Sequence, residues 1–97
     1  EKLGEENIQE INSYKDMIGR CFFFRTITYH LVGKVVSQVG NFFQLEGASW
    51  IPDSGRFMDA IKTGTLNEVE PVGTVFVNLE SVTDMFPIKW TLPTEQK

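Results

Sequence analysis

The stretch that decides the fold is RCFFFRTITYHLVGKVVSQVGNFFQLE, residues 20–46. Residues 20–28 and 31–39 are rich in aromatic and β-branched side chains, which is typical of strands. In the second of these segments one face is predicted to carry Leu31, Val35 and Val39. The pair Gly40-Asn41 predicts a turn, after which residues 42–45 return antiparallel to the preceding strand. Residues 20–46 are therefore predicted to form a three-stranded meander.

Working outward, the N-terminal side is predicted to be helical. Between Gly4 and Ile18 the apolar residues recur at helical spacing, so we expect one helix within residues 1–18. On the C-terminal side the strand pattern stops after Leu45, where glycine and proline predict a loop. A short helix is predicted within residues 53–64, capped by its first or second residue, Asp53 or Ser54, and ended by Gly64.

The last part of the chain is predicted to add two strands. Pro71 and Gly73 indicate a loop, and residues 74–87 then contain two short strands, over 74–79 and 81–86. Five short strands with one inserted helix predict a mainly β domain, a small five-stranded barrel of the SH3 type, over residues 1–97. An open five-stranded α+β sheet is the alternative architecture.

Composition excludes several classes of protein. The chain has 97 residues, 41% hydrophobic and 23% charged, which is enough for one core and not typical of disorder. It has no apolar run of about 18 residues, the length that a membrane span needs. We expect a soluble protein in the cytoplasm of a bacterial host cell. A net charge of −4 argues against general nucleic-acid binding. The positive charges, however, include an acid-free group within residues 17–45: Arg20, Arg25 and Lys34.

No enzyme signature is present in the sequence, and no cofactor is expected. The one cysteine, Cys21, lies among phenylalanines, where a thiol is usually buried and inert. The one histidine, His30, is more typical of a structural role than of a base. The acids around the central loop, Glu46, Asp53 and Asp59, are interpreted as capping and surface residues. A single cysteine and a single histidine also provide no metal cluster.

Two groups of strand residues resemble the two strand signatures of Sm-like RNA-binding proteins. They are the run from Gly33 to Leu45, and the later pair Val75-Phe76-Val77 and Val82-Thr83-Asp84-Met85. The resemblance implies the architecture only. The turn Val39-Gly40-Asn41 is shorter than in the Sm pattern, and a helix-containing stretch separates the two signatures, so uridine binding is not carried over.

A second resemblance covers Phe24 to Pro87. Its segments are Phe24-Arg25-Thr26, Gly33, Leu45–Trp50, Gly55–Ala60 and Val82–Pro87. They look like a group of small phage and prophage proteins of unknown function. More distantly, they are similar to the phage anti-Thoeris sponge proteins, which are oligomeric and sequester immune signalling nucleotides. This resemblance implies a phage origin, a homo-oligomer and a small cyclic nucleotide or ADP-ribose-like ligand.

Four residues are predicted to bind such a ligand: Arg25, Thr26, Trp50 and Arg56. A guanidinium fits a phosphate in a forked geometry, and a hydroxyl can add a hydrogen bond. An indole can stack on a base. Two structural readings stay open, namely that Arg25 pairs with an acid of the same chain and that Trp50 closes the end of the barrel. A further tryptophan, Trp90, either packs on a partner subunit or covers an open edge.

The sequence thus predicts a phage counter-defence protein that sequesters a small anionic nucleotide without catalysis. The alternative is a protein-interaction module, an inhibitor of a host defence enzyme or a phage assembly protein, that acts through an acidic surface. Its acids would include Glu68, Glu70 and Glu80. A hydrolase of small phosphate esters is a third reading.

Overall fold

The computed structural model describes residues 11–97, which form a five-stranded antiparallel sheet with one short α-helix. The elements in chain order are η1 (Tyr14–Met17), β1 (Cys21–Thr26), β2 (His30–Val39), β3 (Phe42–Asp53), α2 (Phe57–Thr63), β4 (Glu68–Asn78), η2 (Leu79–Ser81) and β5 (Val82–Pro87). This confirms the predicted class, which is mainly β with a helix between the third and fourth strands.

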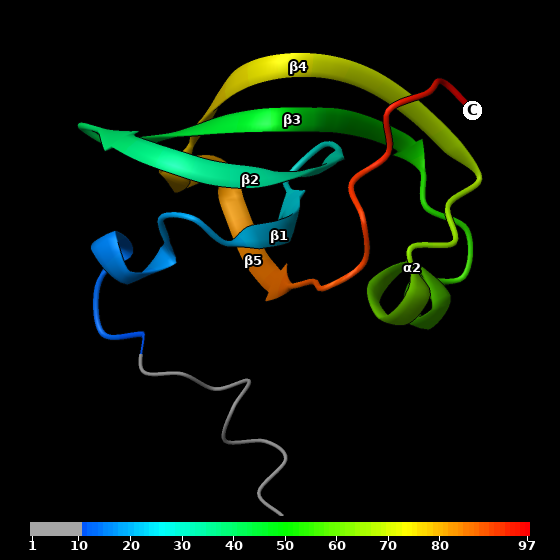
Figure 1. Ribbon diagram of the computed structural model, residues 1–97, viewed down its shortest axis with the longest axis horizontal. Coiled ribbons are helices and arrows are strands. Elements are labelled where there is room, and N and C mark those ends of the chain that lie inside the picture. Colours follow the sequence, from blue (N-terminus) through cyan, green and yellow to red (C-terminus); the bar gives the residue numbers. More distant parts are fainter. Residues whose placement is uncertain (1–10) are drawn as a thin grey trace, which may run out of the picture.

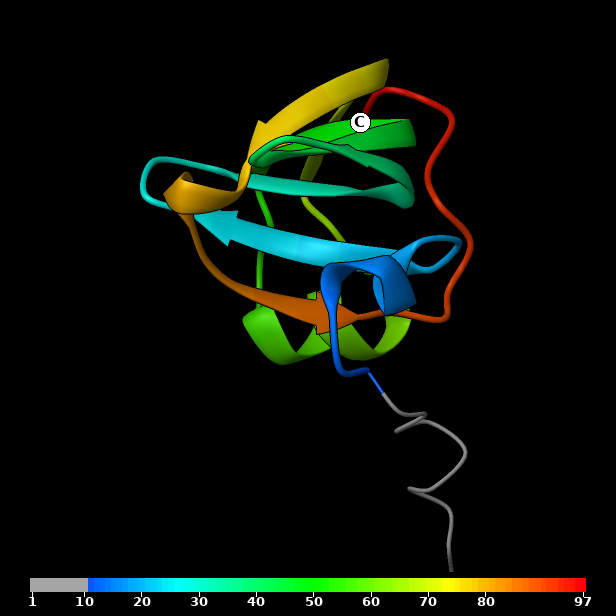
Figure 2. The same cartoon turned by 90° about the vertical axis from the view of Figure 1, so that its left-hand side faces the viewer.

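The sheet is strongly bent, and its strand order is β4-β3-β2-β1-β5. Strands β2, β3 and β4 form one curved layer, and β1 and β5 cross beneath it (Figure 1). The view from the side shows β5 along β1, with α2 below them and the C-terminal segment running up the edge of the molecule (Figure 2). The first three strands form the predicted meander, and β4 and β5 end the sheet.

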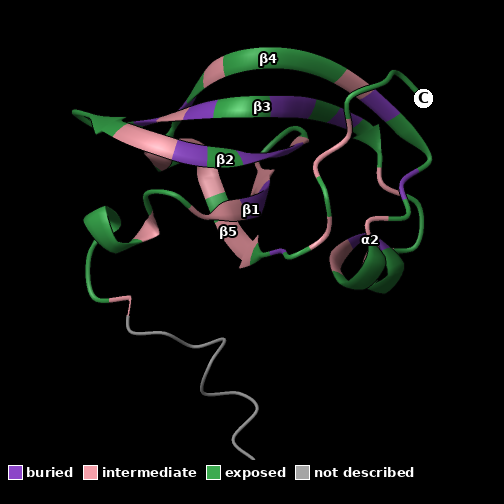
Figure 3. Cartoon of the chain, viewed as in Figure 1, coloured by how far each residue is buried: buried purple, intermediate pink, exposed green. Residues whose placement is uncertain are grey.

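The three consecutive phenylalanines Phe22, Phe23 and Phe24 connect two apolar clusters, because neighbouring side chains of a strand point to opposite faces. Phe22 and Phe24 belong to the cluster inside the bent sheet, which also contains Leu31, Val35, Phe43, Leu45, Ala48 and Val77. Phe23 belongs to the cluster between the sheet and α2, with Val32, Ile51, Ala60, Leu66, Val69 and Ile88. Buried residues occur along β1, β2 and β3, whereas in β4 only Val69 and Val77, near its two ends, are buried (Figure 3).

The loops predicted after Leu45 and at Pro71–Gly73 are both wrong, because the strands continue through them. β3 runs on to Asp53, with its register to β4 shifting between Leu45 and Ala48. Gly47 has a φ of 59°, so it takes the backbone conformation that such an irregularity needs without strain. β4 contains Pro71, which is tolerated because β4 is an edge strand.

A second irregularity changes which side of β2 is buried. The register between β2 and β3 shifts between Val35 and Ser37, so the alternation of side chains reverses there. Val35 is fully buried as predicted, whereas Val39, predicted on the same face, is 54% exposed. Beyond the bulge, Val39 pairs with Phe42 of β3, which is also exposed.

Of the two predicted helices, the one before Gly64 is present, and the N-terminal one is represented in the described residues only by a short 3-10 turn. α2 is followed by the C-cap Gly64, whose φ of 76° is left-handed as predicted. Its N-cap residue is Arg56, because Asp53 instead accepts the backbone N–H of Gly55 in the turn before the helix. Residues 1–10 of the predicted N-terminal helix lie outside the described residues. In the rest, only η1 is helical, as a single 3-10 turn.

The segment after β5 covers the cluster beneath α2. Ile88 is buried there, and Trp90 Nε1 donates a hydrogen bond of 2.9 Å to the carbonyl of Ile61 on α2. Trp90 therefore packs within the chain, against the helix. The backbone of Lys97 pairs with that of Val69 through two hydrogen bonds of 2.9 Å, which covers one end of the β4 edge.

Candidate binding site

Arg25 has a carboxylate partner of its own chain. On β1 it lies opposite Asp84 of β5, and its Nε and Nη2 donate hydrogen bonds of 2.7 and 2.6 Å to the two carboxylate oxygens. Its guanidinium also lies over the ring of Phe57 at 5.1 Å and near that of Phe86 at 5.9 Å. Of the two readings left open for Arg25, the structure has the intramolecular pair.

The charges around this pair act on each other. The hydrogen bonds that Arg25 donates to Asp84 hold the pKa of Asp84 below its ordinary value and raise the pKa of Arg25. His30 lies opposite Arg25 on β2, with its ring 5.2 Å from that of Phe23. Burial, and then the charge of Arg25, lower the pKa of His30, so its neutral form is favoured. His30 therefore contributes a ring that packs against Phe23 beside the Arg25–Asp84 pair.

Thr26 uses its hydroxyl to build the turn between β1 and β2. Its Oγ1 donates to the carbonyl of Tyr29 at 2.7 Å and accepts the backbone N–H groups of Thr28 and Tyr29 at 3.3 and 3.0 Å. This is the local side-chain bonding that holds threonine-containing turns. The hydroxyl predicted to bind a ligand therefore holds Tyr29 in place.

The four predicted ligand residues do not meet in one place. Arg25 faces the α2 side of the sheet, and Arg56 precedes Phe57, the residue over which the Arg25 guanidinium lies. Trp50 lies on the other side, because its neighbour Ile51 points into the α2 cluster and successive side chains alternate. The structure therefore gathers the arginines on one side of the sheet and Trp50 on the other.

Trp50 has an aromatic neighbour that the sequence did not single out. The rings of Tyr29 and Trp50 are 5.9 Å apart at an angle of 85°, and the two residues are 43% and 42% exposed. They form part of an open pocket of about 280 Å³, whose other lining residues are Leu31, Val72 and Val75. We call this the aromatic pocket. Because Trp50 is exposed, it does not close the end of the sheet.

An acid flanks the aromatic pocket. Glu70 of β4 lies directly opposite Trp50 of β3, so the two side chains share a face. Gln96 Nε2 donates a hydrogen bond of 3.2 Å to Glu70 Oε2. The positions of Glu70 and Val72 beside Trp50 follow from the pairing of β3 with β4 beyond Leu45. The sequence did not predict this pairing because Gly47, Pro71 and Gly73 indicated loops.

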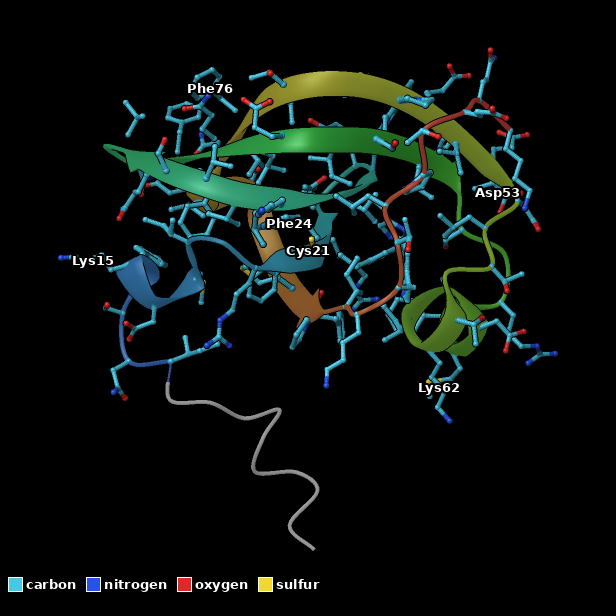
Figure 4. All side chains as sticks on the ribbon, in the orientation of Figure 1. Lys15, Cys21, Phe24, Asp53, Lys62 and Phe76 are labelled. Atoms are coloured by element: carbon cyan, nitrogen blue, oxygen red, sulfur yellow. The ribbon has the colours of Figure 1, made fainter. Side chains whose placement is uncertain are left out.

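Other exposed apolar residues lie on the outer face of the sheet. Phe42 and Phe76 are 41% and 51% exposed, and they share this face because Phe76 pairs with Gln44, two residues from Phe42. Figure 4 shows Phe76 on the outer side of the sheet. Phe76 lies on β4, one of the two edge strands.

Chemistry beyond binding has few candidates in the described part of the chain. Burial raises the pKa of the Cys21 thiol, which disfavours the reactive thiolate. Within residues 11–97, no group of three or more histidine, cysteine or acidic side chains could hold a metal ion. In the same residues, no helix is both long enough and apolar enough to span a membrane.

Comparison with known proteins gives a likeness in structure. No family model matches the chain, and no curated protein matches it. Among solved structures, a heptameric archaeal Sm protein superposes with a TM-score of 0.56 at 22% identity, over 77% of this chain and 94% of the other. The SmAP1 heptamer of P. aerophilum gives a TM-score of 0.57 at 21% identity, over 92% and 96%.

A third similar structure comes from a NatC complex bound to CoA. One of its chains superposes with a TM-score of 0.56 at 19% identity, over 84% of this chain and 90% of that one. At such identities the likeness concerns the fold, and the resemblance to phage proteins stays a prediction. The chain therefore has the Sm-like fold of five antiparallel strands, with its short helix inserted between β3 and β4.

Proposed function

We propose that this protein is a non-catalytic interaction module that holds a partner protein at the aromatic pocket. The observation that carries the proposal is the exposed pair Tyr29 and Trp50 beside an open apolar floor. Tryptophan and tyrosine are the residues that most often dominate the energy of protein interfaces, because they bury a large area at little entropic cost. An exposed apolar surface of this kind indicates a binding site.

The charges near the aromatic pocket favour this function over nucleotide binding there. All five residues that line the pocket are uncharged, and Glu70 beside Trp50 would repel a phosphate. Arg25, the predicted phosphate ligand, lies on the other side of the sheet and is paired with Asp84. A phosphate that used the whole Arg25 fork would have to displace that carboxylate.

We further propose that the module works as a homo-oligomer. The two similar archaeal Sm structures are heptamers, and β4 and β5 end the sheet of this chain. Edge strands offer unpaired backbone groups to a neighbouring chain. An oligomer would present several aromatic pockets, so a partner with repeated sites would bind with a higher overall affinity than one pocket provides.

A second candidate is the counter-defence sponge, which would sequester a small cyclic nucleotide or an ADP-ribose-like molecule in the bacterial cytoplasm. The observation that favours it is the placement of the two arginines. Arg25 Nη1 lies outside the Asp84 pair, and Arg56 is exposed next to Phe57, which the Arg25 guanidinium contacts. In this candidate the ligand would bind on the α2 side, without Trp50.

Native mass spectrometry of the protein purified gently from cells with an active nucleotide-based defence tests both candidates. The interaction module predicts a defined oligomer that gains the mass of one protein, which Trp50→Ala abolishes. Lys62→Ala is the matched control, since Lys62 lies on α2 and points away from the sheet (Figure 4). A retained mass of a few hundred daltons per chain, lost in Arg25→Ala and Arg56→Ala, would instead support the sponge.

A further inference from the structure

We infer that the aromatic pocket is a receptor for an ammonium group, carried by a lysine side chain, methylated or not, of the partner protein. This inference rests on the proposed interaction function and names the chemistry of the group that the pocket takes. It depends on three features of the described residues: two perpendicular rings, an apolar floor and an adjacent carboxylate.

The two rings are placed as walls around a cation. Tyr29 and Trp50 stand at 85° to each other with their centroids 5.9 Å apart, so the rings touch and a group placed in the open angle beside them can contact both. The faces of tryptophan and tyrosine attract cations through their quadrupoles, and tryptophan does so most strongly. Thr26 holds the backbone from which the Tyr29 ring extends, because its hydroxyl bonds both the N–H and the carbonyl of Tyr29.

The floor of the pocket strengthens that attraction. Leu31, Val72 and Val75 are aliphatic, so a cation that enters loses water on that side. Cation–π attraction rises when the cation is desolvated. The pocket volume of about 280 Å³ leaves room for the methylene stem of a lysine as well as for its head group. Such stems pack well on apolar surface while the charged end stays near polar groups.

Glu70 supplies the complementary charge. It lies opposite Trp50 across the β3–β4 pair, and Gln96 holds its carboxylate by a hydrogen bond. An opposite charge beside aromatic walls selects a cation over a neutral group of the same shape. The same protein uses this arrangement on its other side, where two rings, Phe57 and Phe86, and the carboxylate of Asp84 surround the Arg25 guanidinium.

The test uses the full chain and two small probes of equal shape. Choline carries a quaternary ammonium, and 3,3-dimethyl-1-butanol is its neutral isostere. NMR of the indole N–H signals follows the binding, because Trp50 lies in the pocket whereas Trp90 donates its N–H to Ile61 and serves as an internal reference. We expect choline to shift the Trp50 signal and to bind at least about fivefold more tightly than the alcohol.

Two variants separate the rings from the charge. Trp50→Leu keeps an apolar wall but removes the reporter indole, so its choline binding is followed by the backbone N–H signal of Tyr29 and should be weakened at least about fivefold. Glu70→Gln should weaken it as well and should flatten its dependence on salt. Glu68→Gln is the matched control, because Glu68 is an exposed acid on the same strand that pairs with Asp53 instead of Trp50. An unchanged Trp90 signal confirms that each variant is folded.

The outcomes distinguish this inference from the proposed function. The ammonium site is overturned if choline and the alcohol bind equally, if neither binds, or if Glu70→Gln has no effect. In each of these cases, loss of the partner protein in Trp50→Ala would still support the interaction module. Selective choline binding together with a partner that Trp50→Ala retains would establish the ammonium site and refute the proposed function.

Discussion

Arg25 and Asp84 are 59 positions apart in the sequence, yet they face each other across β1 and β5 with both carboxylate oxygens bonded to the guanidinium. The pair is partly exposed, with side chains that are 41% and 38% accessible. Two parallel hydrogen bonds in this forked geometry fix orientation as well as adding attraction. The pair therefore holds the last strand of the sheet in register on the first.

We predict that Asp84→Asn lowers stability at neutral pH and that the loss becomes smaller in acid. Because Arg25 depresses the pKa of Asp84 in the folded state, the carboxylate stabilises the fold above pH 3.8 and loses this effect as the pH falls through its folded pKa. Thermal unfolding of both proteins at pH 7 and near pH 2.5 measures this. Asp59→Asn, at an exposed acid of α2, is the control. A gap between the curves that is the same at both pH values would contradict the prediction.

His30 should make the protein less stable below pH 6.5. Its pKa is lowered in the fold, so the unfolded chain takes up the proton first, and stability is lost as the pH falls from 6.5 through the folded pKa. We expect the melting temperature of the wild type to fall between pH 7.5 and pH 5, and that of His30→Phe, which keeps a ring beside Phe23, to fall less. Parallel curves for the two proteins would refute this role of His30.

Gly64→Ala is predicted to destabilise the protein by about 2–4 kcal/mol. The left-handed φ of 76° costs an alanine about 1 kcal/mol, and its Cβ would lie 2.5 Å from Trp90 Cδ2, a ring held by its bond to Ile61. Gly40→Ala is the control, because Gly40 has a φ of 59° and open space around its Cβ position, so only about 1 kcal/mol should be lost. Urea unfolding measures the free energy of unfolding of both variants. Equal losses of stability would show that the Trp90 ring moves aside for the new methyl group.

Phe76→Glu should shift the protein toward smaller oligomers. Phe76 is 51% exposed on the edge strand β4, and a charge there opposes the approach of a neighbouring chain. Light scattering after size-exclusion chromatography measures the mass across a concentration series. Met58→Glu, at a 56% exposed position of α2, should leave the mass unchanged. If the wild type is a monomer at every concentration, the proposed homo-oligomer is refuted.

The local pattern of the sequence predicted the meander well, since alternation and the Gly40-Asn41 turn depend on near neighbours. It failed where the sheet departs from regular geometry. The bulge after Val35 reversed the side chains of β2 and exposed Val39. Gly47 and Pro71, which usually mark loops, are accommodated inside long strands by register shifts that only the pairing with a neighbouring strand makes favourable.

Only part of the candidate site was predicted, because the sequence did not show how far β3 extends. The sequence predicted Trp50 and Arg25 as ligand-binding residues, but placing them on the sheet required the length of β3. Once β3 continues to Asp53, Trp50 falls on the face opposite Arg25 and beside Tyr29. The sequence also could not predict which residue pairs with Arg25, because it contains thirteen acidic residues.

The pairing of β1 with β5 also determines how the chain can fold. Contacts between β1, β2, β3 and β4 join segments that follow one another, whereas β5 pairs with β1 across a long separation, such as the 59 positions between Arg25 and Asp84. Closing so long a loop lowers the conformational entropy of the chain before any stabilising contact between β1 and β5 forms. We therefore expect β5 to dock late and to slow folding. Until then β1 exposes an unpaired edge that carries three phenylalanines, which makes the unfinished molecule prone to aggregate. During synthesis this hazard lasts until the codons for residues 82–87 have been translated and β5 has left the ribosome.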